Sequence, residues 1–167
     1  DWSALCGQEM VHAGRYVAPV GGSPYEGVLL GRMTVEKAST NYKALKAIMD
    51  ECVKLVEAHH GEKIIAVTET TKDGFTMSVL GHTSAPGIGI AVGTWKDVIV
   101  MGFGGLGLMN DCVKLLKGDS EIKSLVSTER FKNAFAKLPP AEDEIFFFDL
   151  SNMLGQLKNM MSVLAGH

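Results

Sequence analysis

The chain has 167 residues, a length that suits one domain of ordinary size with its own hydrophobic core. Hydrophobic residues make up 46% and charged residues 21%, which is the composition of a folded globular protein and excludes disorder over most of the length. The net charge is −3 and no basic patch stands out, so nucleic acid is a poor partner. No apolar run reaches the roughly 18 residues of a membrane-spanning helix, so the sequence predicts no transmembrane segment.

Residues 1–26 hold four glycines and two prolines, a composition typical of loops. We expect an N-terminal arm that packs on the domain, with a short strand near residues 15–20. The first residues lack the basic start and apolar core of a signal peptide, and the chain does not begin with Met. We therefore expect a processed product or part of a longer chain, with a single α+β domain over residues 27–167.

The clearest signal follows this arm. The apolar run at residues 27–33 predicts a buried strand, and Thr34 then suits the N-cap of a helix. Glu36 falls in the first turn, where the helix dipole favours an acid. Apolar residues recur at steps of three and four, which predicts an amphipathic helix over residues 35–58.

Four strand-like runs come next, at residues 63–71, 75–80, 88–92 and 98–101. Asp73 and Gly74 lie between the first two runs and signal a type I′ hairpin, because both central residues of that turn need positive φ. Apolar and polar residues alternate in the second run, so one face of that strand is buried. These runs predict an antiparallel meander of about four strands.

The C-terminal third alternates helix signals with one strand signal. Helices are expected from Leu106 to Gly118, from a Ser127 N-cap to Pro139, and over residues 150–164, with a helical connector at residues 120–126. The aromatic run within residues 144–149 predicts a central strand. The whole order is β-α-β-β-β-β-α-α-β-α, which predicts an α+β fold: a largely antiparallel sheet with helices packed on one face.

Gly102, Gly104 and Gly107 match the pattern G-x-G-x-x-G between a strand and a helix. Glycines in that position let backbone amides approach a pyrophosphate at a helix N-terminus. The rest of a dinucleotide unit is missing, because no acid ends a second strand about 20 residues later and the preceding strands form a meander. We interpret residues 102–107 as a strand-to-helix corner, with nucleotide binding as the alternative, and expect no cofactor.

Other candidate chemistry is sparse. His59 and His60 are adjacent at a helix end, and with His82 they lack the spacing of a metal site. Residues 142–144 are acidic and suit a solvated loop. No nucleophile elbow, P-loop or Ser/His/Asp order is present, so we assign no catalytic residue and no metal ligand.

Sulfur-containing residues favour packing roles. Cys6, Cys52 and Cys112 are far apart without a C-x-x-C spacing, and the interpretation is buried thiols. Nine methionines fall mostly on expected apolar faces, which indicates core filling. A pliable, Met-lined pocket for an apolar ligand is the alternative.

The second half also carries a pattern of packing and turn residues. Its parts are Ala91-Val92, residues 98–102, Ser124-Leu125, Phe131, Ala134, Leu138-Pro139 and residues 147–150. On these residues the chain resembles a module of uncharacterised bacterial cell-envelope proteins, and the strand and helix of residues 28–55 fit as well. The resemblance spans most of residues 27–160. It implies an exported or lipid-anchored protein with duplicated strand-helix-meander modules, and it brings no established activity and no catalytic residues. The chain departs from that family in its richer glycine cluster and in lacking an export signal.

These observations lead to one main hypothesis. The chain is expected to be a non-enzymatic, envelope-associated or periplasmic domain with a binding, scaffolding or assembly role, acting through a protein partner or self-association. The alternatives are a nucleotide-binding enzyme that uses residues 102–107, and a carrier of an apolar small ligand.

Overall fold

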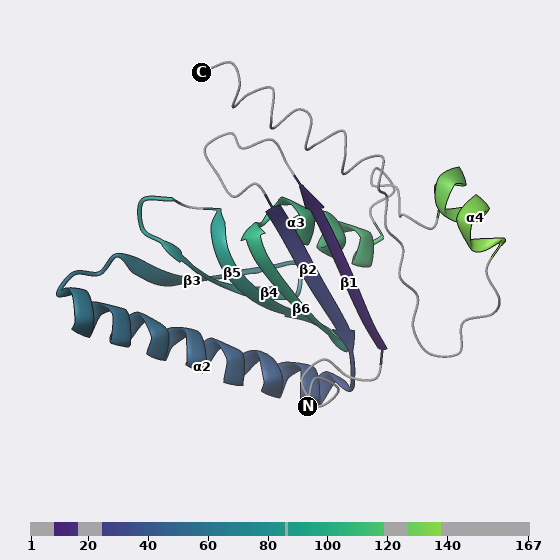
Figure 1. Ribbon diagram of the computed structural model, residues 1–167. Coiled ribbons are helices and arrows are strands. Elements are labelled where there is room, and N and C mark those ends of the chain that lie inside the picture. Colours follow the sequence, from purple (N-terminus) through teal and green to yellow (C-terminus); the bar gives the residue numbers. More distant parts are fainter. Residues whose placement is uncertain (1–8, 17–24, 86, 119–126, 138–167) are drawn as a thin grey trace, which may run out of the picture. The chain divides into compact units, whose positions relative to one another are not determined.

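The computed structural model describes residues 9–16, 25–85, 87–118 and 127–137 (Figure 1). The chain divides into two compact units, Asp1–Met109 and Asn110–His167, and each is described on its own. The expected connector at residues 120–126, the acidic run, the strand at residues 144–149 and the last helix lie outside the described residues, as does Cys6.

The first unit contains a six-stranded antiparallel sheet in the order β1-β2-β6-β5-β4-β3. Its strands are β1 (Glu9–Tyr16), β2 (Tyr25–Arg32), β3 (Ile65–Lys72), β4 (Phe75–His82), β5 (Ile88–Trp95) and β6 (Val98–Gly105). The predicted meander of four strands, β3 to β6, is confirmed, and so is the α+β class. β2 joins the meander by pairing with β6.

The N-terminal edge of the sheet differs from the expectation. The sequence favours a short strand near residues 15–20, whereas β1 is Glu9–Tyr16 and pairs with β2 over its full length. The domain boundary expected after residue 26 falls inside β2. β1 has two adjacent apolar residues, Met10 and Val11, and a glycine, Gly14, so it lacks the clean alternation that marks a strand in sequence. Its conformation depends on the hydrogen bonds that β2 supplies.

Helix α2 (Val35–His60) links β2 to β3 and lies along one face of the sheet (Figure 1). The Oγ1 atom of Thr34 accepts a hydrogen bond from the amide of Lys37 at 3.3 Å, which confirms the predicted N-cap. Gly61 ends the helix in a left-handed conformation with φ of 74°, and its amide donates to the carbonyl of Glu57. The helix therefore ends two residues later than expected, at the glycine that its C-terminus requires.

The core lies between α2 and the middle of the sheet. Tyr42 and Met49 of α2 pack with Val92 of β5 and Ile99 of β6, and all four are buried. Full burial of one such side chain contributes about 1.5–3 kcal/mol. The predicted hairpin is also present, because Asp73 and Gly74 both have positive φ, 51° and 75°. We call the side of the sheet that α2 covers the α2 face.

The opposite face is buried at its centre as well. Val28, Ala91 and Val100 are fully buried there, on three neighbouring strands. Met109, in the first turn of α3 (Gly107–Leu116), packs against Gly102 of β6 on this side. Helical residues therefore contact the sheet on both faces.

Only a short helix is described for the second unit beyond α3. This helix, α4, is Glu129–Phe135. The Oγ1 atom of Thr128 accepts a hydrogen bond from the amide of Phe131 at 3.3 Å, so Thr128 caps the helix rather than the expected Ser127. Thr128 directly precedes Glu129, the first residue of the helix, and a cap hydroxyl in that position bonds the amide two or three residues later.

Candidate functional site

The glycine stretch at residues 102–107 is mostly strand. β6 continues to Gly105, and only Leu106 separates it from α3. Gly102 is buried, and a Cβ atom there would lie 2.7 Å from the sulfur of Met109, so the glycine makes room for a packed side chain. Gly104 has φ of 79°, a conformation that glycine adopts at little cost. The expected corner is therefore shorter than the sequence indicates.

A carboxylate of the chain itself occupies the N-terminus of α3. The two oxygens of Glu26 accept hydrogen bonds from the amides of Gly107 and Leu108, each at 3.0 Å. Arg15 donates to the same carboxylate at 2.6 Å, and Glu26 is only 7% exposed. A Cβ atom on Gly107 would lie 2.7 Å from Oε1 of Glu26. These two amides, which a bound phosphate would need, thus have an internal anion as partner.

The strands around the glycines have the wrong direction for a dinucleotide unit. β2 and β5 flank β6, and both run antiparallel to it. Dinucleotide fingerprints lie in βαβ units, at the carboxyl end of a parallel sheet. Gly102, Gly104 and Gly107 lie between β6 and the start of α3, as the motif requires. The neighbouring strands, however, are antiparallel and do not form the parallel βαβ unit in which this motif binds a dinucleotide.

A second polar cluster joins α2 to the sheet. The hydroxyl of Tyr42 lies 2.7 Å from Oγ of Ser78 and donates to Oε2 of Glu69 at 2.9 Å. Ser78 is fully buried, so no substrate reaches its hydroxyl. Burial raises the pKa of Tyr42, the nearby Glu69 carboxylate raises this pKa further, and the hydrogen bond with Ser78 lowers it. The cluster holds α2 on β3 and β4.

Replacement of Tyr42 by phenylalanine is expected to lower the free energy of unfolding by about 1–3 kcal/mol near neutral pH, because it removes the hydrogen bonds of a buried hydroxyl. The advantage of the wild type depends on pH. Its Tyr42 has a pKa above the ordinary value of 10.0, so the unfolded state loses this proton first. The advantage is fully present below pH 10.0 and is lost as the pH rises through the folded-state pKa. Urea unfolding of both proteins at increasing alkaline pH tests this. A difference that stays constant with pH would contradict it, since all other groups titrate in both proteins.

An aromatic platform lies on the α2 face, made of His12, Tyr25 and Phe103. The rings of His12 and Phe103 are stacked at 6.2 Å and 9°, and those of Tyr25 and Phe103 at 5.9 Å and 28°. Below them, Gly14 and Gly27 are cross-strand partners. A Cβ atom on Gly27 would collide with the ring of Phe103, and one on Gly14 with the ring of Tyr25. These two glycines allow the rings to lie flat on the sheet.

The platform is exposed and is extended by aliphatic side chains. Ile90 pairs with Phe103 across β5 and β6, and these residues are 57% and 38% exposed. Met10 precedes His12 by two residues, which places it on the same face, and it is 48% exposed. Single exposed apolar residues are ordinary, whereas several on one surface are a feature that many interaction sites share. No local sequence pattern indicates this group, because its members come from four strands.

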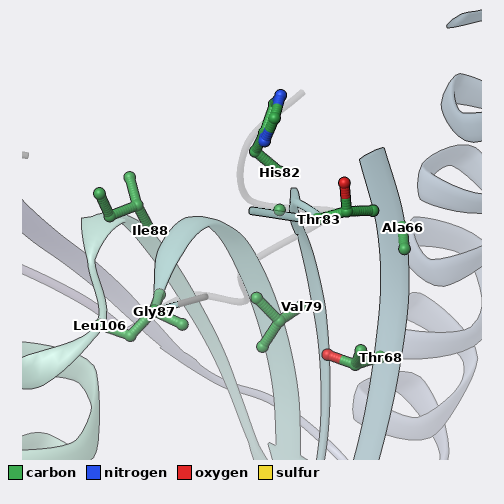
Figure 2. Close-up of a pocket in the computed structure, with 9 residues that line it drawn as sticks. Ala66, Thr68, Val79, His82, Thr83, Gly87, Ile88 and Leu106 are labelled. Carbon is green, nitrogen blue, oxygen red and sulfur yellow. The ribbon is translucent and has the colours of Figure 1, made fainter. Parts of the chain in front are cut away.

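A hollow of about 210 Å³ lies on the face opposite α2, between β3, β4 and the end of β6. In Figure 2, Ile88 and Leu106 stand on one side of it and Thr68 on the other, with Val79 between them. His82, at the rim, binds the hydroxyl of Ser84 through its Nδ1 atom at 2.8 Å. The lining contains no methionine, so this hollow is not the Met-lined pocket of the third hypothesis.

Four methionines of the described residues have packing positions, whereas Met10 is exposed. Met49 and Met109 are buried, and Met33 and Met101 pack against the core cluster. Cys52 and Cys112 are half-buried, less enclosed than the sequence suggests.

The described residues contain no cluster of potential metal ligands. No three His, Cys, Asp or Glu side chains gather there as ligands would. His59 and His60 contact each other edge to face at 5.1 Å at the end of α2.

Comparison with known proteins gives no further identification. No family model, no curated protein and no solved structure matches the chain. Within the described residues, no helix combines the length and the apolar character needed to cross a membrane.

Proposed function

We propose that this chain is a non-catalytic binding and assembly domain that acts at the cell envelope through protein contacts. The observation that carries the proposal is a contrast between its polar and apolar groups. The most enclosed polar groups, Glu26 and Ser78, have internal partners. The aromatic platform, in contrast, remains exposed with Ile90 and Met10 beside it. The envelope location is supported by the resemblance of the sequence pattern.

Apolar surface of this kind favours association. Aromatic residues and methionine are enriched at the centres of protein interfaces, where they supply contact area at a low cost in side-chain entropy. The rings of the platform are already stacked and supported by the two glycines below them. A partner would therefore meet a surface that needs little ordering on binding.

Photo-cross-linking tests whether a protein partner binds at the platform. A photoreactive benzophenone side chain replaces Phe103 in the full chain, which is expressed in the cells that naturally produce it. The matched control carries the same group in place of Leu55, which is 69% exposed on α2. We expect discrete cross-linked protein bands, in the envelope fraction, from the first position and not from the second.

Equal labelling at both positions, or a soluble chain that turns over a small metabolite, would contradict the proposal. The nucleotide alternative is checked on the same material by thermal shift with NAD(P), FAD and ATP. A ligand at 100 times its Kd adds about 2.7 kcal/mol of stability, so real binding is visible. We expect no shift, because the amides of Gly107 and Leu108 already bind Glu26.

A further inference from the structure

The outer edge of β1 has no neighbouring strand in the part of the chain that the structure describes. β1 ends the sheet and pairs over its length with β2. Neither a proline nor a bulge interrupts it, because the pairing runs without a break from Glu9 to Tyr16. The backbone groups along such an edge are a template for another strand. Met10 and Val11 lie on opposite faces of this edge and are 48% and 60% exposed.

The other edge of the sheet is protected. Helix α2 packs against β3, and the last five residues of β3 are exposed and polar. They are Thr68, Glu69, Thr70, Thr71 and Lys72. Polar and charged side chains are a common way to keep an edge strand from pairing. β1 also carries charged side chains, but it exposes the apolar residues Met10 and Val11 as well, so of the two edges it is the better suited to accept a strand.

The charged residues of β1 favour a second copy of the same strand, in antiparallel orientation, as its partner. Glu9 lies near the start of the strand and Arg15 near its end, six residues apart and so on the same face. An antiparallel copy of β1, in a register centred on His12, places Glu9 opposite Arg15 of the copy, and this contact occurs twice. A parallel copy would place like charges side by side. An antiparallel shift of two residues, which keeps the faces matched, would place Arg15 opposite Val11 or Glu9 opposite Ala13. Opposite charges in a cross-strand pair are favourable and like charges are not.

The other side chains fit the same register. Val11 falls opposite Ala13 of the copy, and Met10 falls opposite Gly14, so a large residue meets a small one in each pair. Arg15 keeps its bond to Glu26, because a guanidinium has five donors and this side chain is 41% exposed. The Glu9 side chain is 73% exposed and accessible to a second cation. On the α2 face, the two aromatic platforms would adjoin at the two-fold axis.

We propose that the chain forms a homodimer in which β1 pairs antiparallel with β1 of a second copy, in the register centred on His12. The inference rests on the proposed assembly function and specifies its partner. The two sheets become one continuous sheet, and the exposed edges of both copies are buried. Isologous pairing of this kind closes on itself, so it yields a dimer and not a fibre.

The register is tested by disulfide trapping in the full chain, with Cys6, Cys52 and Cys112 replaced by alanine. Val11→Cys and Ala13→Cys are made separately and then mixed under oxidation. Opposed residues of antiparallel strands have Cα atoms about 4.5–5.5 Å apart, within reach of a disulfide. Two copies of the same variant are offset by two residues, beyond about 7 Å. We expect a covalent dimer from the mixture and not from either variant alone. A covalent dimer from either variant alone overturns the proposed register, and so does the absence of a covalent dimer from the mixture.

Analytical ultracentrifugation tests the association itself. The wild type is expected to have twice the mass of the chain, and Glu9→Arg is expected to weaken the dimer by about tenfold or more, because two like-charge contacts replace two opposite-charge contacts. Glu57→Arg makes the same change of charge at the exposed end of α2 and should leave the dimer intact. A monomeric wild type, or equal effects of the two variants, overturns the proposal. If the chain is monomeric yet cross-links to another protein through position 103, the assembly function stands and only the homodimer fails.

Discussion

Replacement of Glu26 by alanine is expected to lower the free energy of unfolding by about 2–4 kcal/mol, because it removes an N-cap and a charge-assisted bond together. The amides of Gly107 and Leu108 would lose their acceptor, and Arg15 would lose its carboxylate partner. Glu26 is 7% exposed, so water replaces the missing oxygens poorly. Urea denaturation at neutral pH, followed by circular dichroism, measures the change.

Two further variants separate the contributions. Glu26→Gln keeps one acceptor oxygen but no charge, so its cost should fall between those of the alanine variant and the wild type. Arg15→Met leaves both amide bonds to Glu26 in place and removes the ion pair. Because Arg15 is 41% exposed, this pair should contribute about 1 kcal/mol or less. A larger loss from Arg15→Met than from Glu26→Ala would show that the carboxylate does not cap the helix.

Local signals account for the part of the fold that the sequence predicts. Thr34 is recognised as a cap because its hydroxyl bonds an amide three residues away. Asp73 and Gly74 are recognised as a turn because few residues adopt positive φ at two successive positions. Each feature is set by neighbours in the chain. The meander and α2 follow from such signals, and both are confirmed.

The candidate sites depend on contacts between distant residues. Glu26 and Gly107 are 81 positions apart, and nothing in the apolar run after Glu26 indicates that this acid binds a helix. The aromatic platform likewise joins His12, Tyr25 and Phe103 from three strands. The edge position of β1 follows from the pairing of β2 with β6, which no local pattern encodes. Sequence periodicity gives the face of each strand, but not the order of the strands.

The glycine cluster shows how one pattern permits two structures. Gly102 and Gly104 suggest a break in regular structure, because glycine weakens a strand. Here β2 and β5 pair with β6 on both sides, and their hydrogen bonds keep residues as far as Gly105 in the sheet. The missing side chains leave space for Met109 at Gly102, and for the Glu26 carboxylate at Gly105 and Gly107. Packing partners, which the local sequence does not reveal, decide the conformation.

Two isoleucines on the α2 face provide the sharpest test of what that helix covers. Ile99 is 1% exposed and packs with Tyr42 and Met49, so Ile99→Ala should cost about 2–5 kcal/mol in unfolding free energy. Ile90 lies on the same face beside the platform and is 57% exposed, so Ile90→Ala should cost no more than about 0.5 kcal/mol.

The same denaturation experiment gives both values, measured at a protein concentration low enough to keep the chain monomeric. Since both changes remove the same atoms from the same face of one sheet, their difference measures burial alone. A cost above about 2 kcal/mol for Ile90→Ala in the monomer would mean that the chain itself covers this surface. The platform would then be part of the core, and a partner could not bind there.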